Sequence, residues 1–202
     1  MYKLYNVKRW GSMGVHLVLE ELGVPYQNIW MTAEQVRVPE FRDISPLGLI
    51  PALGLADGRT MIESAAMVSF LTTAHAEKGL APVPGTADHG MYLSWLHFMS
   101  TNVYVSIDLT MTENDPGFQK LHRELAVIEK HLSEEGPLML GNTFSALDIY
   151  LFMLTIWCKP SEQKVLDMYP AIARVCAEVR ARPKLKAALE AHGTYAVGAY
   201  GG

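Results

Sequence analysis

Cysteine is scarce in this chain of 202 residues: there are two, Cys158 and Cys176, both in the last third. Two cysteines so placed form no disulfide framework, no Cys-x-x-Cys redox motif and no zinc site. We therefore expect both thiols to be buried and to pack as small apolar side chains. The seven histidines show no metal-ligand spacing, so the sequence predicts no metal site.

The chain also lacks a basic excess and a long apolar run. Its 17 Lys and Arg against 21 Asp and Glu give a net charge of −4, which argues against nucleic acid as a partner. The most apolar run, residues 149–158, is shorter than the ~20 residues that span a bilayer, and the N-terminus lacks the apolar stretch of a signal peptide. With 50% hydrophobic residues, we expect a folded, soluble protein of the reducing cytoplasm with no membrane partner.

Residues 1–79 mix short strand-like and helix-like segments. Strand patterns occupy residues 4–7, 27–31, 50–55 and 60–62, and helical patterns occupy residues 15–22 and 64–76. Gly23 supplies a C-terminal stop for the first helix. The resulting order, β-α-β-(loop or helix)-β-β-α, predicts a small mixed sheet with helices on its faces.

A segment rich in Pro and Gly, residues 80–87, follows as a candidate linker. After it the strand signals end, and apolar residues recur at helical spacing in residues 92–103, 118–132, 172–179 and 185–189. Residues 149–157 are apolar nearly all round, as in a central buried helix. Residues 88–202 are therefore predicted to form an all-α bundle.

Pro51 enters a predicted strand, where a proline cannot donate to the sheet ladder. A cis Ile50–Pro51 bond would turn the chain sharply and leave the backbone N–H and C=O of Ile50 free to pair with an extended, peptide-like ligand. An ordinary edge-strand proline is the alternative interpretation.

Glu63 and Ser64 open the next helix. Ser64 can act as its N-cap, or its hydroxyl and the first free N–H groups can bind a carboxylate at the positive helix end. Glu63 could then accept a hydrogen bond from an α-amino group. Together the two residues would suit the zwitterionic end of an amino acid, although a plain capping pair is the simpler alternative.

Taken together, these segments resemble the cytosolic glutathione transferases over essentially the whole chain. The resemblance implies a thioredoxin-like α/β domain that binds glutathione (residues 1–79), a linker (80–87), an all-α helical bundle (88–202) and a homodimer. It includes Ser145-x-x-Asp148 before the apolar helix, which looks like the structural capping box of the family.

The resemblance also implies a binding site for glutathione as co-substrate. Leu49, Ile50 and Pro51 would hold its cysteinyl part, chiefly through the backbone of Ile50, and Glu63 and Ser64 would bind its γ-glutamyl end. Two positions depart from the family pattern. Leu49 stands where many members have Lys or Gln, so a polar contact would come from elsewhere, such as Gln35 or Arg37. Asn102 stands where many bacterial members have an acidic residue that reaches the partner subunit's ligand.

The thiol-activating residue is expected at the start of the first helix, because a hydrogen-bond donor near the sulfur stabilises the reactive thiolate. Ser12 is the first candidate. Gly11 takes the place of the cysteine of beta-class members, and a Ser at the spacing of Ser12 is the presumed thiol contact in bacterial β-aryl etherases. Tyr5, which matches the spacing of the Tyr-type transferases, is the alternative. Trp10 and Tyr104 are candidate walls of a pocket for the second substrate.

The implied function is that of a glutathione transferase, in detoxification or aromatic catabolism. The thiolate of bound glutathione would attack an electrophilic carbon of a small, mostly hydrophobic molecule, aromatic compounds included. A glutathione-dependent β-aryl ether lyase or isomerase, a non-catalytic binding module and a glutaredoxin-like reductase are the alternatives.

Overall fold

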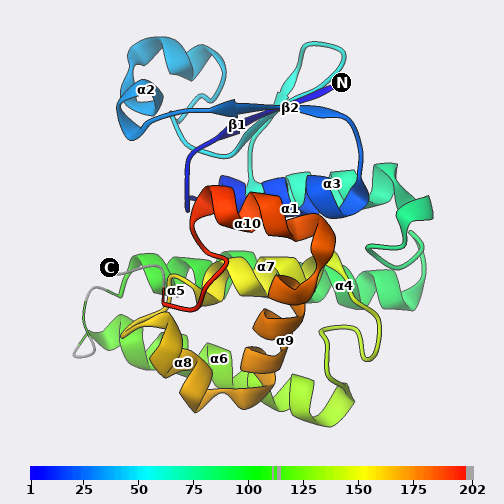
Figure 1. Cartoon of the computed structure of the whole chain (residues 1–202), viewed down its shortest axis with the longest axis vertical. Coiled ribbons are helices and arrows are strands. Elements are labelled where there is room, and N and C mark those ends of the chain that lie inside the picture. The colour runs from blue at the N-terminus through cyan, green and yellow to red at the C-terminus, as the bar shows by residue number, and fades with distance from the viewer. Residues whose placement is uncertain (111, 113–114, 199–202) are drawn as a thin grey trace.

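A computed structural model of the chain describes residues 1–110, 112 and 115–198. The last four residues of the predicted helical domain, 199–202, lie outside the described residues. A sheet forms one layer at the top of Figure 1, two helices lie beneath it, and a larger set of helices fills the rest of the molecule.

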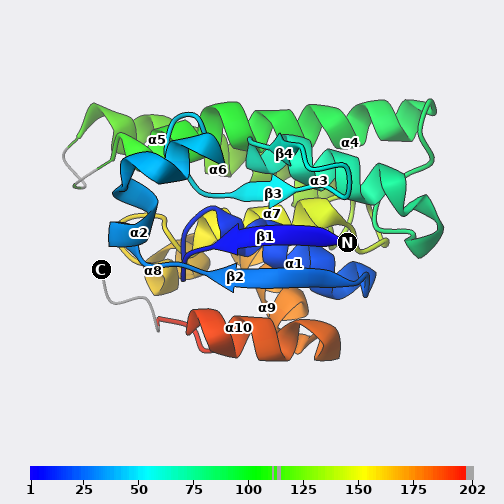
Figure 2. The same cartoon turned by 90° about the horizontal axis from the view of Figure 1, so that it is seen from above.

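The sheet has four strands in the order β2-β1-β3-β4 (Figure 2). β1 (Tyr2–Asn6) pairs in parallel with β2 (Tyr26–Trp30) and antiparallel with β3 (Ala52–Gly54), which pairs antiparallel with β4 (Thr60–Met61). The alternation of β1 buries Leu4 and Asn6 on one face. The predicted order of strands is confirmed, with boundaries shifted by at most two residues.

α1 (Ser12–Leu22) and α3 (Ser64–Ala74) lie against the face of the sheet that looks towards the helical layer. α1 ends at Gly23, whose φ of 65° is the left-handed conformation that glycine adopts without a Cβ clash. α2 (Ala33–Arg37) occupies the segment that the sequence left open as loop or helix. Its start is fixed by a reciprocal capping box between Thr32 and Gln35.

The helical layer confirms the predicted all-α part of the chain. α4 (Ala87–Phe98) continues through a π-helical turn at Met99–Val103 into α5 (Tyr104–Asp108). The helices that follow are α6 (Pro116–Glu135), α7 (Ala146–Thr155), α8 (Glu162–Met168), α9 (Pro170–Ala181) and α10 (Lys186–His192). In the described part of the chain, no helix is both long and apolar enough to cross a lipid bilayer.

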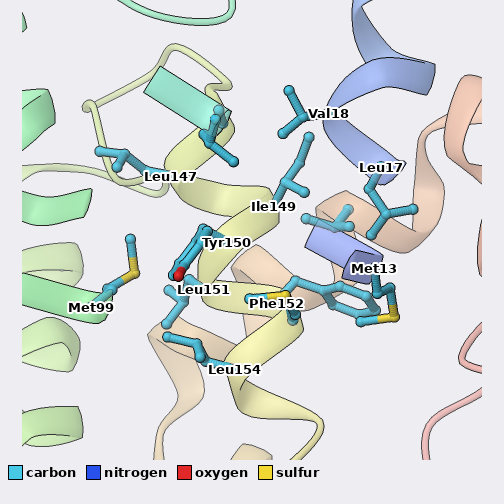
Figure 3. Close-up of a cluster of buried hydrophobic side chains, with 14 of the residues drawn as sticks. Met13, Leu17, Val18, Met99, Leu147, Ile149, Tyr150, Leu151, Phe152 and Leu154 are labelled. Carbon is cyan, nitrogen blue, oxygen red and sulfur yellow. The ribbon is translucent and has the colours of Figure 1, made fainter. Parts of the chain in front are cut away.

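α7 is the central helix of the core, as its unbroken apolar sequence predicts. Every residue from Ala146 to Thr155 is buried. Figure 3 shows its side chains between Met13, Leu17 and Val18 of α1 on one side and Met99 on the other. Cys158 and Cys176 are also buried, and burial raises the pKa of both thiols. The prediction that the cysteines pack as apolar side chains is therefore confirmed.

The contact between α1 and α7 fixes the position of the loop before α1. A Cβ atom on Gly14 would lie 2.7 Å from the sulfur of Met153, so any larger residue there would force this buried side chain to move. At the other end of α1, Arg182 forms a two-pronged ion pair with Glu21, at 2.7 and 2.8 Å. The N-terminal end of α1 is thus held rigidly against the helical layer.

The capping box at the start of α7 is confirmed. The Asp148 carboxylate is fully buried and accepts hydrogen bonds from the Ser145 N–H at 2.8 Å and the Ser145 hydroxyl at 3.0 Å. Its other oxygen accepts from the Met139 N–H at 2.9 Å. One buried side chain therefore joins the loop after α6 to the first turn of the central helix.

Candidate functional site

A cavity of about 280 Å³ opens where the sheet layer meets the helical layer. It is lined by residues from three separate segments that the sequence singled out, namely Leu49, Ile50, Pro51, Glu63, Ser64 and Tyr104. The first three lead into β3, the next two open α3, and the last opens α5. The fold therefore gathers at one place side chains that lie up to 55 positions apart.

The chain entering β3 presents unpaired backbone to this cavity. The Ile50–Pro51 peptide bond is cis, as predicted. No hydrogen bond joins the backbone N–H or C=O of Ile50 to any residue that the structure describes. The Leu49 N–H is held by the Ser45 hydroxyl at 3.1 Å, while the Leu49 side chain is 59% exposed.

Neither Gln35 nor Arg37 is among the described residues that line the cavity. The Gln35 side chain accepts a hydrogen bond from the Thr32 N–H at 2.9 Å, which commits it to the capping box of α2. The other polar side chains in the described lining, besides Glu63, Ser64, Tyr104 and Tyr150, are those of Ser45, Ser100 and Asp108.

The start of α3 differs from the simple cap that the sequence allowed. Glu63 is the residue before the helix, with a φ of 71°, and its side chain makes no capping hydrogen bond. Ser64 is the first helical residue, so it is not the N-cap. Its hydroxyl lies 2.8 Å from the Tyr150 hydroxyl of α7. A carboxylate and a hydroxyl thus face the cavity beside the positive end of an 11-residue helix.

A second cavity, of about 460 Å³, adjoins the first. Its walls include Trp10 and Gly11 before α1, Tyr104 of α5, and Trp157 and Lys159 after α7. The rings of Tyr104 and Trp157 meet edge to face with their centres 5.4 Å apart. Among the described residues, four line both cavities: Leu49, Ile50, Tyr104 and Asp108.

Ser12 and Tyr5 lie elsewhere. The Ser12 side chain is fully buried, and its hydroxyl accepts from the Val7 N–H at 3.1 Å and donates to the Val7 C=O at 3.2 Å. The Tyr5 ring packs edge-on against Phe41 on another part of the sheet layer. Neither residue is in the described lining of the two cavities.

The sequence reasoning missed Asp108, Tyr150, Trp157 and Lys159 as cavity-lining residues. All four come from helices or helix ends whose apolar periodicity indicates packing and says nothing of which residues face the other layer. Tyr150 lies within the apolar run of α7. Its hydroxyl was the only sign in the sequence that this residue could face a polar site.

The loop before α1 is fastened to the helical layer by hydrogen bonds through Arg9. The Arg9 N–H donates to Nδ1 of His192 at 3.1 Å, and the Arg9 C=O accepts from the Trp157 indole at 2.8 Å. His192 Nδ1 therefore carries no proton, and Nε2 of that ring donates to Nδ1 of His16, 3.0 Å away. Both rings are neutral in this arrangement and both are buried.

This histidine pair is expected to make the fold sensitive to acid. Burial lowers the pKa of His16 to about 4, and burial together with the neighbouring His16 lowers the pKa of His192 to about 3. In the unfolded chain both rings bind a proton at a pKa of about 6.5. The unfolded state therefore binds more protons as the pH falls below that value. Each ring contributes about 2 kcal/mol, so we expect the free energy of unfolding to be about 4 kcal/mol lower at pH 5 than at pH 7.

Denaturant unfolding between pH 7 and pH 5 measures this loss in a range above the ordinary pKa of most carboxylates. A His192→Gln variant keeps a hydrogen-bond acceptor for the Arg9 N–H and removes one titrating ring, so its stability should depend less on pH. If the free energy of unfolding fell equally with pH in both proteins, the histidine pair would not be the source of the acid sensitivity.

The comparisons with known proteins agree with this geometry. The N-terminal domain of glutathione S-transferases matches residues 12–74, and the C-terminal domain of the same family matches residues 111–192. The chain belongs to the glutathione S-transferase family. The fold that the resemblance implied, a thioredoxin-like layer followed by a helical bundle, is confirmed by the solved glutathione transferase structures.

Solved glutathione transferases match almost the whole chain. The enzyme from Methylococcus capsulatus strain Bath is 28% identical, with a TM-score of 0.85 over 96% of this chain and 99% of that one. A sphingomonad glutathione S-transferase solved in complex with glutathione is 26% identical, with a TM-score of 0.82 over 95% and 98%. The glutathione S-transferase-like protein OpS6 of Beauveria bassiana is 26% identical over 91% of this chain and 92% of its own.

Proposed function

We propose that this protein is a glutathione transferase, which binds glutathione in the first cavity and presents its thiol to an electrophile in the second. The observation that carries the proposal is the joint lining of one cavity by Ile50, Glu63 and Ser64, with a second cavity sharing its wall. These residues were expected to bind glutathione from two unconnected motifs. Their convergence supports a single site for an extended tripeptide.

The proposed binding follows the chemistry of each group. The unpaired N–H and C=O of Ile50, flanked by Leu49 and Pro51, pair with the cysteinyl backbone as an added strand would. The Glu63 carboxylate accepts hydrogen bonds from the α-ammonium group of the γ-glutamyl residue. The Ser64 hydroxyl and the free N–H groups of the first turn of α3 bind the adjacent carboxylate.

The proposed reaction begins when the thiol of glutathione releases its proton to solvent. The thiolate then attacks an electrophilic carbon, so that a sulfur–carbon bond forms while the bond from that carbon to its leaving group breaks. The leaving group departs with the electron pair of that bond. Trp10, Tyr104 and Trp157 offer aromatic walls to the second substrate, which favours an aromatic electrophile.

A glutathione-dependent β-aryl ether lyase or isomerase begins with the same thiolate and the same aromatic second cavity. The aromatic walls favour an enzyme of aromatic substrates over one that acts on small aliphatic electrophiles.

Partners and location stay as predicted from the sequence: a small electrophile, a second copy of the chain and the cytoplasm. Exposed apolar side chains on α3 and α4, Phe70 and Met91, support the homodimer.

Ser12→Ala distinguishes a structural role of Ser12 from the thiol contact that the sequence predicts. In the described structure its hydroxyl satisfies both backbone groups of Val7. We therefore expect the variant to lose about 1–2 kcal/mol of unfolding free energy and to leave the pKa of the bound thiol unchanged. Denaturant unfolding and a pH titration of the bound thiol measure the two quantities. Unchanged stability with a raised thiol pKa would instead place the Ser12 hydroxyl at the sulfur.

The proposed function is tested by glutathione-affinity chromatography followed by turnover of a generic aryl halide and of a β-aryl ether. Retention with turnover of either substrate supports a transferase, and the preferred substrate separates conjugation from ether cleavage. Retention without turnover of any electrophile would indicate a binding module. Failure to bind glutathione would contradict the proposal.

A further inference from the structure

The two cavities meet at a short junction, and the geometry of that junction restricts where a reacting sulfur can lie. A thiol held in the first cavity must reach an electrophile in the second, so it lies against residues that line both. Among the described residues these are Leu49, Ile50, Tyr104 and Asp108. Only Tyr104 and Asp108 carry polar side-chain atoms, and only the Tyr104 hydroxyl has a proton to donate when Asp108 is ionised.

The Tyr104 hydroxyl is directed at the start of α1 and at the chain entering β3. A Cβ atom on Gly11 would lie 2.8 Å from the Tyr104 oxygen, 3.4 Å from Cδ of Pro51 and 3.6 Å from the carbonyl oxygen of Ile50. Because Gly11 has no side chain, the Tyr104 hydroxyl packs against the backbone of Gly11. The hydroxyl therefore lies near the chain that enters β3, whose Ile50 backbone the proposed function assigns to the cysteinyl residue.

The Tyr104 hydroxyl also has an unused hydrogen-bonding capacity. The structure records a ring contact with Trp157 for this side chain, but no hydrogen bond from its hydroxyl to any described residue. By contrast, the hydroxyls of Tyr150 and Ser12 are both engaged, with Ser64 and with Val7. A phenol that faces a ligand cavity without a protein partner is available to a ligand atom.

We infer that the Tyr104 hydroxyl is the group that donates a hydrogen bond to the sulfur of glutathione and stabilises its thiolate. The inference rests on the proposed function and assigns a catalytic residue to it. The phenol keeps its own proton throughout, while the proton of the thiol goes to solvent and the sulfur lone pair attacks the electrophilic carbon. The donor comes from α5 of the helical layer, whereas the sequence predicted one near the start of α1.

The electrostatics of the site agree with a donor role. Burial, followed by the nearby charges of Asp108 and Glu63, raises the pKa of Tyr104 to about 12. The phenol is therefore protonated at neutral pH and ionises after a thiol, whose ordinary pKa is about 8.5. The Asp108 carboxylate, lining the same junction, opposes a neighbouring thiolate, so the two residues act on the sulfur in opposite directions.

The test is the pKa of the bound thiol, followed by ultraviolet absorbance of the thiolate during a pH titration of the glutathione complex. We expect Tyr104→Phe to raise this pKa by about one unit and to lower kcat/KM roughly tenfold, with little change in the dissociation constant for glutathione. Gly11→Ala, whose methyl group would lie 2.8 Å from the Tyr104 oxygen and push the hydroxyl aside, should raise the thiol pKa as well. Asp108→Asn should lower it.

Tyr195→Phe is the matched control, because Tyr195 is exposed and lies in neither cavity. The thiol of glutathione bound to Tyr195→Phe should have the same pKa as in the unsubstituted protein. A Tyr104→Phe variant that binds glutathione with an unchanged thiol pKa would overturn this inference and leave the proposed function standing. A chain that binds no glutathione would overturn both.

Discussion

Glu63→Ala is expected to weaken glutathione binding by about 10- to 100-fold. A hydrogen bond between charged partners contributes ~1.5–3 kcal/mol, and each 1.4 kcal/mol is about tenfold in a dissociation constant. The backbone C=O of Glu63 accepts from the Met67 N–H, but its carboxylate makes no hydrogen bond or ion pair with any residue that the structure describes. The loss should therefore appear in binding, measured by titration calorimetry, and not in the free energy of unfolding.

Two controls distinguish loss of the contact between Glu63 and the ammonium group from a general effect of removing a negative charge. Glu77→Ala removes an acidic side chain that lies outside the described cavity lining, so it should bind glutathione like the unsubstituted protein. A glutathione analogue without the α-amino group should bind Glu63→Ala and the unsubstituted protein equally well. Unaltered affinity of Glu63→Ala for glutathione itself would rule out the γ-glutamyl assignment.

Asp148→Ala is expected to lower the free energy of unfolding by about 3 kcal/mol. A helix cap alone contributes ~0.5–2 kcal/mol, and buried donors left without an acceptor cost ~1–3 kcal/mol. Here one carboxylate serves the N–H groups of Ser145 and Met139 and the hydroxyl of Ser145. Denaturant unfolding measures the loss. Asp148→Asn keeps one acceptor oxygen, so its free energy of unfolding should lie between those of the unsubstituted protein and Asp148→Ala.

Asp88→Ala is the control for this variant, because Asp88 is an exposed aspartate in the first turn of α4. Its unfolding free energy should change by less than about 1 kcal/mol. The surviving folded fraction of Asp148→Ala should turn over substrate at a normal rate. A stable Asp148→Ala protein without activity would contradict the structural assignment of the capping box.

Much of the fold was predictable because its signals are local. Gly23 and Ser145-x-x-Asp148 mark helix ends by their own backbone chemistry, and the apolar run of α7 indicates burial regardless of the partner. The position of Pro51 indicated a special backbone before β3. Each of these features is caused by residues that are close together in the sequence, so it can be predicted from a single sequence.

The rest of the site depends on contacts between distant segments. The Tyr104 hydroxyl meets the place of a Gly11 side chain across 93 positions, and Ser64 is bonded to Tyr150 of α7 rather than acting as a cap. Ser12 showed the right spacing for a thiol contact, but spacing does not reveal that its hydroxyl closes the loop on Val7. Side-chain direction at such points is set by packing between the two layers.

A structure of the complex with glutathione would show where the tripeptide and its sulfur lie. We expect the cysteinyl backbone to pair with Ile50 and the γ-glutamyl end to lie on Glu63 and Ser64. We expect the sulfur within hydrogen-bond distance of the Tyr104 hydroxyl, at the junction of the two cavities. A tripeptide bound outside the first cavity would contradict the proposed site. A correctly bound tripeptide with its sulfur turned to Ser12 and away from Tyr104 would contradict the assignment of the thiolate donor.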